Sequence, residues 1–548
     1  MVEEKISLWK NSINLEKNLK VELSQLTSKE IYDRFSTDLE FGTGGLRGPM
    51  GVGTSRINIH TIMHAAAGFG SYLKKKYSSG TVAISYDNRK NSYLFAYKSA
   101  LVLSNLNFKV LLFEKLRPTP MLSFAVRYFK CIGGIMITAS HNPKEDNGFK
   151  AYNSSGAQLN LDESKEVISE ISKIKNIFSI EEGDKKNINF IKSTFDDIYL
   201  KEVDKISLNN ENKIISIVYS ALHGTGGEVI PRYLSSKGYK VHLVESETKP
   251  DPLFTNTHST NPENPLSFNN SLKIAEKTNS DLVIVTDPDA DRLGISVKDK
   301  GNYVLLTGNE TASIMLYFLL NYRNYPKNGI IYTTIVTSSL VKEIAKSKDI
   351  KTQETLTGFK FIGEKIEINK MPFIFGCEES YGSLILDSIR DKDAVQASIL
   401  IAEICEELHK KNMSILDLLN DIYKKFGHFI NINKSYRFKD SNGKEKMSKI
   451  LNSLRENKLI VPGIDFFETN DYLKQTKKIG EKSYPTYLPS SNVLSFISKN
   501  FKVTIRPSGT EPKLKIYYEM KSDFSKLKSS QILLNKLITN VEERIYNE

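Results

Sequence analysis

The chain has 548 residues, of which 40% are hydrophobic and 26% are charged, and its formal net charge is +12. This composition excludes disorder along most of the length, and the length alone suggests about three to five domains. The lysines are scattered rather than gathered in one block, so we expect solvated surfaces and no nucleic-acid partner. A mild positive field would suit an anionic small substrate.

The three cysteines, Cys131, Cys377 and Cys405, are too few and too far apart for a disulfide framework, which favours a reducing compartment. Residues 1–20 are charged and helical in character and lack the apolar segment of a signal peptide. The longest apolar stretch, 314–320, is far shorter than the ~20 residues of a membrane span. We therefore expect a cytoplasmic protein without membrane contact, either a monomer or a dimer.

Three short β-branched runs share one plan along the chain. They cover residues 81–85, 214–219 and 330–334, and each ends in a polar or glycine-rich turn followed by a helical pattern. This alternation predicts βα units in parallel or mixed sheets, as distant copies of one α/β module. The last part of the chain differs, with strands predicted at 501–505 and 514–518 and an amphipathic helix over 525–546. The fold class is therefore α/β, with predicted domains 1–205, 206–310 and 311–430 and a smaller α+β domain 431–548.

A polar turn closes the apolar run Ile135 to Ile137 and contains Ser140, His141 and Asn142. The end of a strand is where α/β proteins bind their ligands. Ser140 could be a nucleophile if it is activated, or it could be a serine that only caps a turn.

Three aspartates, Asp287, Asp289 and Asp291, follow the predicted strand 282–285. Three carboxylates this close repel one another unless a cation neutralises them, and oxygen ligands select a hard ion, with Mg²⁺ as the leading candidate. The spacing of a calcium-binding EF-hand is absent. Arg292 follows directly as a donor suited to phosphate. The alternative is a solvated acidic turn.

A second anion site is predicted in "RPSGTEP", which combines Arg506, Ser508, Gly509 and Thr510 in one tight turn. One guanidinium, two hydroxyls and free backbone N–H groups have the composition of a phosphate cradle. It is not a Walker A loop, because the G-x-x-x-x-G-K spacing is absent. A plain turn between strands is the alternative.

Two further loops carry weaker signals. "GCEESYG", residues 376–382, places Glu378 and Ser380 between glycines, where they could hydrogen-bond to sugar hydroxyls, although exposed Glu-Glu pairs are common. "FGTGGLRG", residues 41–48, places Arg47 among glycines, which is consistent with a flexible backbone near an anion.

Together these motifs resemble the α-D-phosphohexomutase superfamily, the phosphoglucomutases and phosphomannomutases. T-A-S-H-N-P, D-P-D-A-D-R, C-E-E-S-Y-G and R-P-S-G-T-E-P occur in the family's order, and the resemblance covers the chain from Phe41 to about Lys515. The extended N-terminus and "GCEESYG" look most like the bacterial phosphoglucomutase and phosphoglucomutase/phosphopentomutase branch.

The resemblance implies a heart-shaped protein of four domains, three similar α/β domains with mixed sheets and a smaller C-terminal domain. It implies that Ser140 is a phosphoserine and completes a Mg²⁺ site with the three aspartates, and that the cofactors include glucose 1,6-bisphosphate as an activator. By the same resemblance, "RPSGT" holds the phosphate that is not reacting. The resemblance further gives the following residues to the substrate or the catalytic centre: Arg47, His141, Asn142, Lys150, Arg292, Glu378 and Ser380.

Two positions depart from the family pattern. Many relatives have glycine where this chain has Cys377, and the phosphomannomutase/phosphoglucomutase branch has histidine where this chain has Gly382. The acid/base role would then fall on Lys392, a lysine position that the phosphoglucomutase branch uses. This difference argues against the phosphomannomutase branch.

The implied reaction interconverts glucose 1-phosphate and glucose 6-phosphate through a bisphosphate that turns end for end. Alternatives on the same scaffold are a phosphomannomutase, a phosphopentomutase and a sugar-bisphosphate synthase. A phosphatase with Asp287 as nucleophile would leave Ser140 without a role, and a degenerate binding protein would not need the intact motifs. No chemistry is assigned to residues 1–40.

Overall fold

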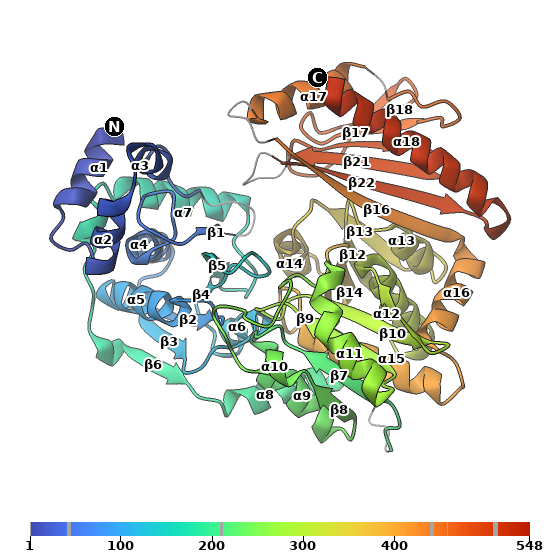
Figure 1. Ribbon diagram of the computed structural model, residues 1–548, viewed down its shortest axis with the longest axis horizontal. Coiled ribbons are helices and arrows are strands. Elements are labelled where there is room, and N and C mark those ends of the chain that lie inside the picture. Colours follow the sequence, from blue (N-terminus) through green and yellow to red (C-terminus); the bar gives the residue numbers. More distant parts are fainter. Residues whose placement is uncertain are drawn as a thin grey trace. The chain divides into compact units, whose positions relative to one another are not determined.

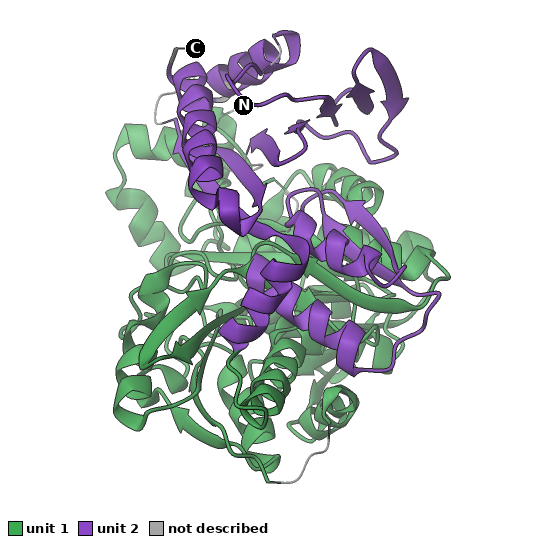
Figure 2. Cartoon of the chain, turned by 90° about the vertical axis from the view of Figure 1, so that its right-hand side faces the viewer, with its two compact units in different colours: residues 1–308, 358–414 green, residues 309–357, 415–548 purple. Residues whose placement is uncertain are grey.

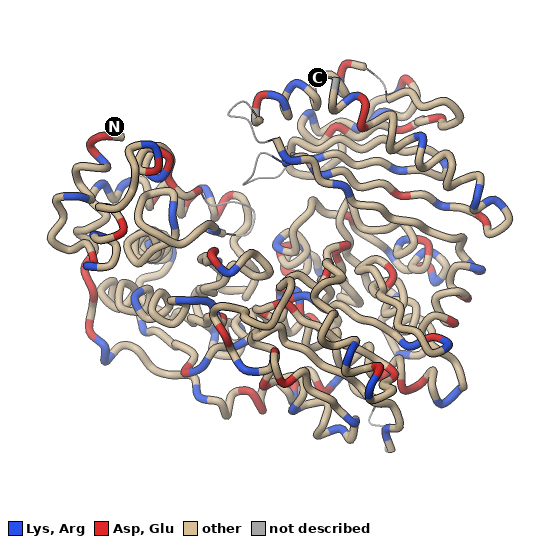
Figure 3. Tube along the Cα trace, viewed as in Figure 1, with Lys and Arg blue, Asp and Glu red and all other residues tan. Residues whose placement is uncertain are grey.

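The computed structural model describes residues 2–40, 45–208, 212–438, 443–457, 459–507 and 513–547 (Figure 1). The chain forms two compact units (Figure 2), of which the first comprises residues 1–308 and 358–414 and the second residues 309–357 and 415–548. Charged residues of both signs are interspersed along the described parts of the trace (Figure 3). None of the helices in the described ranges has the length and apolarity that crossing a membrane requires.

The N-terminal segment is helical, as predicted, and packs on the first α/β domain of unit 1. Its helices are α1 (Val2–Asn11), α2 (Lys17–Gln25) and α3 (Ser28–Phe35). The Trp9 ring is 1% exposed and meets the rings of Phe35 and Phe178 edge to face, at centroid distances of 5.5 and 5.2 Å. Burying these large rings stabilises the docked segment.

The first sheet of unit 1 is mixed, with strand order β1-β5-β4-β2-β3-β6. Strands β2, β3, β4 and β6 are parallel to one another. Strand β5 pairs antiparallel with β4, and β1 pairs antiparallel with β5. The strands are β1 (Leu46–Pro49), β2 (Thr81–Tyr86), β3 (Lys109–Phe113), β4 (Gly133–Ile137), β5 (Asp146–Asn153) and β6 (Ile188–Ile191). The helices of this part are α4 (Ile59–Lys76), α5 (Ser92–Asn105), α6 (Thr119–Tyr128), α7 (Leu161–Lys173) and α8 (Phe195–Val203).

The second sheet of unit 1 is also mixed, with strand order β11-β10-β9-β7-β8. The strands are β7 (Ser216–Ser220), β8 (Lys240–Leu243), β9 (Leu282–Thr286), β10 (Leu293–Asp299) and β11 (Asn302–Leu306). The helices are α9 (Gly226–Ser236), α10 (Glu245–Thr248) and α11 (Asn269–Thr278). β7 begins two residues later than predicted, because the N–H groups of Ile214 and Ile215 donate to the Glu406 carboxylate instead of to a strand.

The third βα segment contributes to both units. Unit 1 contains the hairpin β14 (Phe373–Glu378) and β15 (Gly382–Leu384) with helices α14 (Phe359–Ile368) and α15 (Ala394–His409). Unit 2 contains the parallel pair β12 (Ile330–Thr334) and β13 (Lys351–Thr355) with α12 (Gly308–Tyr322), α13 (Ser339–Lys346) and α16 (Ile415–Phe426).

Unit 2 ends in a seven-stranded sheet of order β16-β22-β21-β20-β17-β18-β19, in which the paired strands are antiparallel. The strands are β16 (His428–Arg437), β17 (Glu468–Asp471), β18 (Thr476–Ile479), β19 (Lys482–Pro485), β20 (Leu494–Ile497), β21 (Phe501–Pro507) and β22 (Lys513–Ser522). One apolar face packs with α17 (Gly443–Glu456) and α18 (Leu527–Asn547). The predicted class, three α/β domains with a further C-terminal domain, is confirmed.

Candidate functional site

The turn that carries Ser140 follows β4 and presents a buried hydroxyl. Ser140 is 1% exposed and has a φ of +53°, which is uncommon for a residue with a side chain and costs about 1–3 kcal/mol. Its N–H donates to Thr138 Oγ1 at 2.8 Å, and its Oγ donates to Asp287 Oδ2 at 2.8 Å. His141 Nδ1 lies 3.2 Å from the same Oγ. The strained turn therefore aims the hydroxyl at the aspartate loop.

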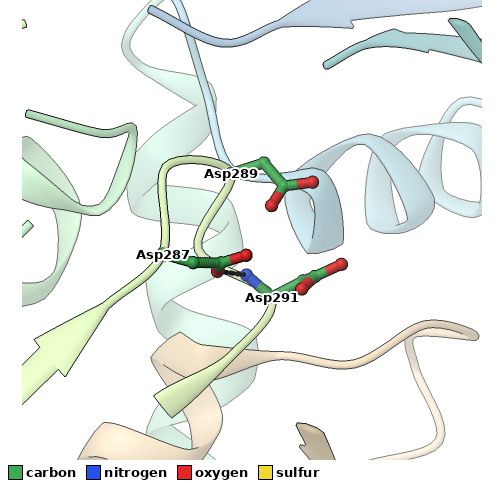
Figure 4. A group of neighbouring side chains, drawn as sticks. All are labelled: Asp287, Asp289 and Asp291. Atoms are coloured by element: carbon green, nitrogen blue, oxygen red, sulfur yellow. Dashed lines mark hydrogen bonds between the residues drawn. The ribbon is translucent and has the colours of Figure 1, made fainter. Parts of the chain in front are cut away.

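The aspartate loop joins β9 to β10 and gathers three buried carboxylates (Figure 4). Asp287 Oδ1 accepts the backbone N–H groups of Asp291 and Arg292, both at 3.0 Å, which closes the loop around one side chain. Ala290, at φ +51°, turns the backbone between Asp289 and Asp291. One oxygen of each carboxylate lies within 4.8 Å of the others.

The electrostatics of the three aspartates are uneven. Burial, followed by the charges of Asp289 and Asp291, raises the pKa of Asp287 well above its ordinary value. Against burial, Lys392 and Lys150 lower the pKa of Asp291. Oδ1 of Asp289 and Oδ1 of Asp291 are buried without a hydrogen-bond partner among the described residues. Buried, unpaired carboxylate oxygens converging on one point fit a hard divalent cation.

Three positively charged side chains of unit 1 lie near this cluster. Lys150, on β5, is 1% exposed, and its Nζ lies 2.8 Å from Asp289 Oδ2 and 3.4 Å from Asp291 Oδ2. Lys392 Nζ lies 3.2 Å from Asp291 Oδ2. Arg47, on β1, has a buried Nε without a partner among the described residues, and its charge contributes to the lowered pKa of Asp291.

Lys392 occupies space that Gly382 leaves open. A Cβ built at position 382 would collide with Cδ of Lys392. Although burial acts in the opposite direction, the charges of Asp291 and Asp391 raise the pKa of Lys392. A larger side chain at position 382 would therefore require the Lys392 side chain to leave its present conformation.

Glu378, the last residue of β14 before the turn to β15, also lies in unit 1. Glu378 is 4% exposed, and its Oε1 accepts the N–H of Gly358 at 2.8 Å. Burial raises the pKa of Glu378, while Lys392 and Arg292 oppose the shift. Ser380 is half-buried in the same turn. Arg292 is paired through Nη1 with Glu263 Oε1 at 2.6 Å.

The predicted phosphate loop is described only in part. Arg506 is the penultimate residue of β21 in unit 2, and its guanidinium lies 6.0 Å from the ring centroid of Tyr517. Ser508, Gly509 and Thr510 lie outside the described residues. The role of this loop stays a prediction.

Two buried residues that support the cluster were missed by the sequence reasoning. Thr119, the first residue of α6, donates its N–H to the Asp289 backbone oxygen at 2.9 Å and its Oγ1 to Asp289 Oδ2 at 2.8 Å. Asp391 accepts Tyr152 Oη at 2.8 Å and Gln158 Nε2 at 2.7 Å and lies beside Lys392. The motif "RPTP" around Thr119 was the available signal, but nothing in the sequence links it to residue 289.

The chain is similar to known proteins in sequence and in fold. Models of the phosphoglucomutase/phosphomannomutase family match residues 38–178 as alpha/beta/alpha domain I, 197–301 as domain II and 307–426 as domain III. The chain is 36% identical to a phosphoglucomutase of Staphylococcus epidermidis over 512 residues, which cover 91% of this chain and 93% of the relative.

Two solved structures show the same fold. Parafusin, a phosphoglucomutase from Paramecium solved in an open form, matches with a TM-score of 0.70 at 20% identity, covering 93% of this chain and 95% of that one. N-acetylphosphoglucosamine mutase of Aspergillus fumigatus, solved with GlcNAc-6P and magnesium, matches with a TM-score of 0.51 at 13% identity over 99% of both chains.

Proposed function

The chain belongs to the phosphoglucomutase/phosphomannomutase family, and we propose that it interconverts glucose 1-phosphate and glucose 6-phosphate through a phosphoserine at Ser140. One observation carries the proposal. The Ser140 hydroxyl lies 2.8 Å from Asp287 Oδ2, in a buried aspartate cluster that two lysines, Lys150 and Lys392, contact. A serine placed in this way can carry a phosphoryl group whose charge the surroundings neutralise.

We infer that the cation is Mg²⁺, held by Asp287, Asp289 and Asp291. The all-oxygen donor set and the unpaired Oδ1 atoms of Asp289 and Asp291 support this identity. The magnesium in the Aspergillus relative agrees with it. When bound, Mg²⁺ would withdraw charge from the phosphoryl oxygens and so lower the barrier to transfer.

The chain's own residues would move one phosphoryl group in two steps. In the first step, a free sugar hydroxyl attacks the phosphorus atom as the bond from phosphorus to Ser140 Oγ breaks, and the proton that the hydroxyl loses is matched by one that Ser140 Oγ gains. In the second step, Ser140 Oγ loses its proton and attacks the other phosphoryl group of the resulting bisphosphate, and the sugar oxygen that leaves takes up a proton. Lys150 and Arg47 face the transferring charge from β5 and β1, where they would stabilise it.

Lys392 is our candidate for the general acid/base. It is the lysine beside Gly382, and its ammonium touches the cluster at Asp291 Oδ2. Its raised pKa keeps it protonated in the resting site, so in the second step it would donate a proton to the departing sugar oxygen and regain the proton that Ser140 Oγ loses. Glu378, Ser380, His141 and Arg292 would bind the sugar phosphate.

The remaining parts of the proposal concern the second phosphate and the primer. Arg506, Ser508, Gly509 and Thr510 would hold the phosphate that is not reacting, since their composition suits an anion. Glucose 1,6-bisphosphate would activate the protein by phosphorylating Ser140. We also propose that the protein is cytoplasmic and that its oligomeric state is a monomer or a dimer.

The choice of sugar has two alternatives, mannose and pentose phosphates. A phosphatase that uses Asp287 as nucleophile lacks support, because both oxygens of Asp287 already accept hydrogen bonds. Rates should therefore be measured side by side with glucose, mannose, ribose and deoxyribose 1-phosphates, each with Mg²⁺ and its bisphosphate primer. We expect the highest kcat/KM with glucose 1-phosphate. A higher value with another sugar would reassign the substrate, and no turnover with any of them would overturn the proposal.

A further inference from the structure

Arg89 lies buried behind the Ser140 turn and has no part in the site described above. It follows β2 in the turn formed by Asp87, Asn88 and Arg89, and its side chain is 0% exposed. A buried arginine needs partners for all of its donors, so its contacts indicate what it does.

The Arg89 guanidinium hydrogen-bonds to four backbone carbonyl groups of the Ser140 turn. Nη2 donates to the oxygens of Ser140 at 2.6 Å and Asn142 at 2.5 Å. Nη1 donates to the oxygens of Pro143 at 2.6 Å and Asp146 at 3.0 Å. Only a planar fork of donors can satisfy four carbonyls at once, and a lysine ammonium cannot reproduce that geometry.

Asp87 lies on the other side of the guanidinium and forms an ion pair with it, although no hydrogen bond joins its Oδ2 to Arg89 Nε. Its Oδ2 lies 3.3 Å from Arg89 Nε, and its Oδ1 accepts the Arg89 N–H at 2.9 Å and Ser92 Oγ at 2.7 Å. This pair ties the turn to the start of α5. Arg89 therefore binds the turn through its two terminal nitrogens while its charge is paired with Asp87.

We propose that Arg89 is a positioning residue for phosphoryl transfer, which holds Ser140 in the left-handed conformation that turns its Oγ toward the aspartate cluster. This inference rests on the proposed function. Arg89 contacts the backbone oxygen of Ser140 rather than its Oγ, so it acts through the turn.

Two variants test the inference. Arg89→Lys keeps the charge but loses the fork of donors. Arg89→Met combined with Asp87→Asn removes charge and fork without leaving an unpaired buried carboxylate, which protects against misfolding. The matched control is Arg455→Lys, because Arg455 is also buried, with its side chain 5% exposed, and paired with a carboxylate, Asp471 at 3.2 Å, but lies in unit 2.

The measurements are kcat and KM for glucose 1-phosphate and hydrogen exchange over residues 138–146. We expect Arg89→Lys to lower kcat by about 10²-fold, the cost of a misplaced reacting group, with KM changed by less than about threefold. Exchange should rise over 138–146 and not over the rest of unit 1. The double variant should lose more kcat, because all four hydrogen bonds from the guanidinium to the turn are gone.

A kcat within about twofold of wild type in both Arg89 variants would overturn the inference while leaving the proposed function intact. A rise in exchange across the whole of unit 1, with kcat falling only in proportion to unfolded protein, would also overturn it, because Arg89 would then be merely structural. If the wild-type protein neither turns over nor carries phosphate, the proposed function fails first and this inference falls with it.

Discussion

The turns around Ser140 and the C-terminal sheet place polar residues in different ways. In unit 1, Ser140, Lys150 and Asp287 come from three elements, and each is 1% exposed or less because they partner one another or neighbouring loops. In unit 2, β21 alternates between the apolar core, which contains Val503 and Ile505, and a polar face with Lys502 and Thr504. Substitutions in the first region should therefore be coupled through the site, whereas those in the second should act locally.

The largest effect should follow removal of the serine hydroxyl. Ser140→Ala should lower turnover by at least about 10⁴-fold with the protein still folded, because it removes the proposed carrier of the phosphoryl group. Ser99→Ala is the control, since Ser99 is also buried but only donates to the Phe95 carbonyl oxygen within α5. Coupled assays and circular dichroism of both variants test this, and substantial activity in Ser140→Ala would refute the mechanism.

Replacing the lysine next to Gly382 should have the second largest effect. Lys392→Met should lower kcat by about 10²–10⁴-fold, because it removes the proposed proton donor at the cluster. Lys342→Met removes a lysine that is paired with Glu354 at 2.8 Å in unit 2, so it should change stability and leave kcat near wild type. Equal losses of kcat in steady-state assays of both variants would contradict a specific role of Lys392 in catalysis.

Loss of the Thr119 hydroxyl should weaken metal binding. Thr119→Val removes the hydrogen bond to Asp289 Oδ2 and should weaken Mg²⁺ binding by about 10–100-fold, while Thr119→Ser should bind nearly as wild type. Titration calorimetry with Mg²⁺ alone checks this independently of turnover. Equal affinities in Thr119→Val and wild type would show that the contact does not orient Asp289.

The smallest effect concerns stability against pH. Burial raises the pKa of Asp393 from 3.8 to about 6, even though Tyr199 Oη donates to its Oδ2 at 2.7 Å. Between these two pH values the folded chain binds a proton that the unfolded chain has released. The free energy of unfolding therefore falls by up to about 3 kcal/mol through this carboxyl as the pH rises. Relative to Asp393→Asn, wild type should therefore become less stable from pH 4 to pH 7 in denaturant titrations. A constant difference would contradict the assignment.

The sequence was sufficient for features that are local in the chain. Ser140 and the three aspartates lie at the ends of strands that the apolar runs predicted. Strand β7 begins later than predicted because Glu406, far along the chain, accepts the N–H groups of Ile214 and Ile215. The supporting contacts could not be predicted in this way. Thr119 meets Asp289 across 170 positions, and Arg89 binds backbone oxygens, which no side-chain pattern reveals.

The measurement that tests the central claim most directly is the mapping of phosphate on the wild-type protein. The chain should be incubated with glucose 1,6-bisphosphate and Mg²⁺, digested and analysed by mass spectrometry. The account predicts one phosphate on Ser140, which is transferred to sugar when glucose 1-phosphate is added. Turnover without phosphate on Ser140, or acyl phosphate on Asp287 in its place, would contradict it.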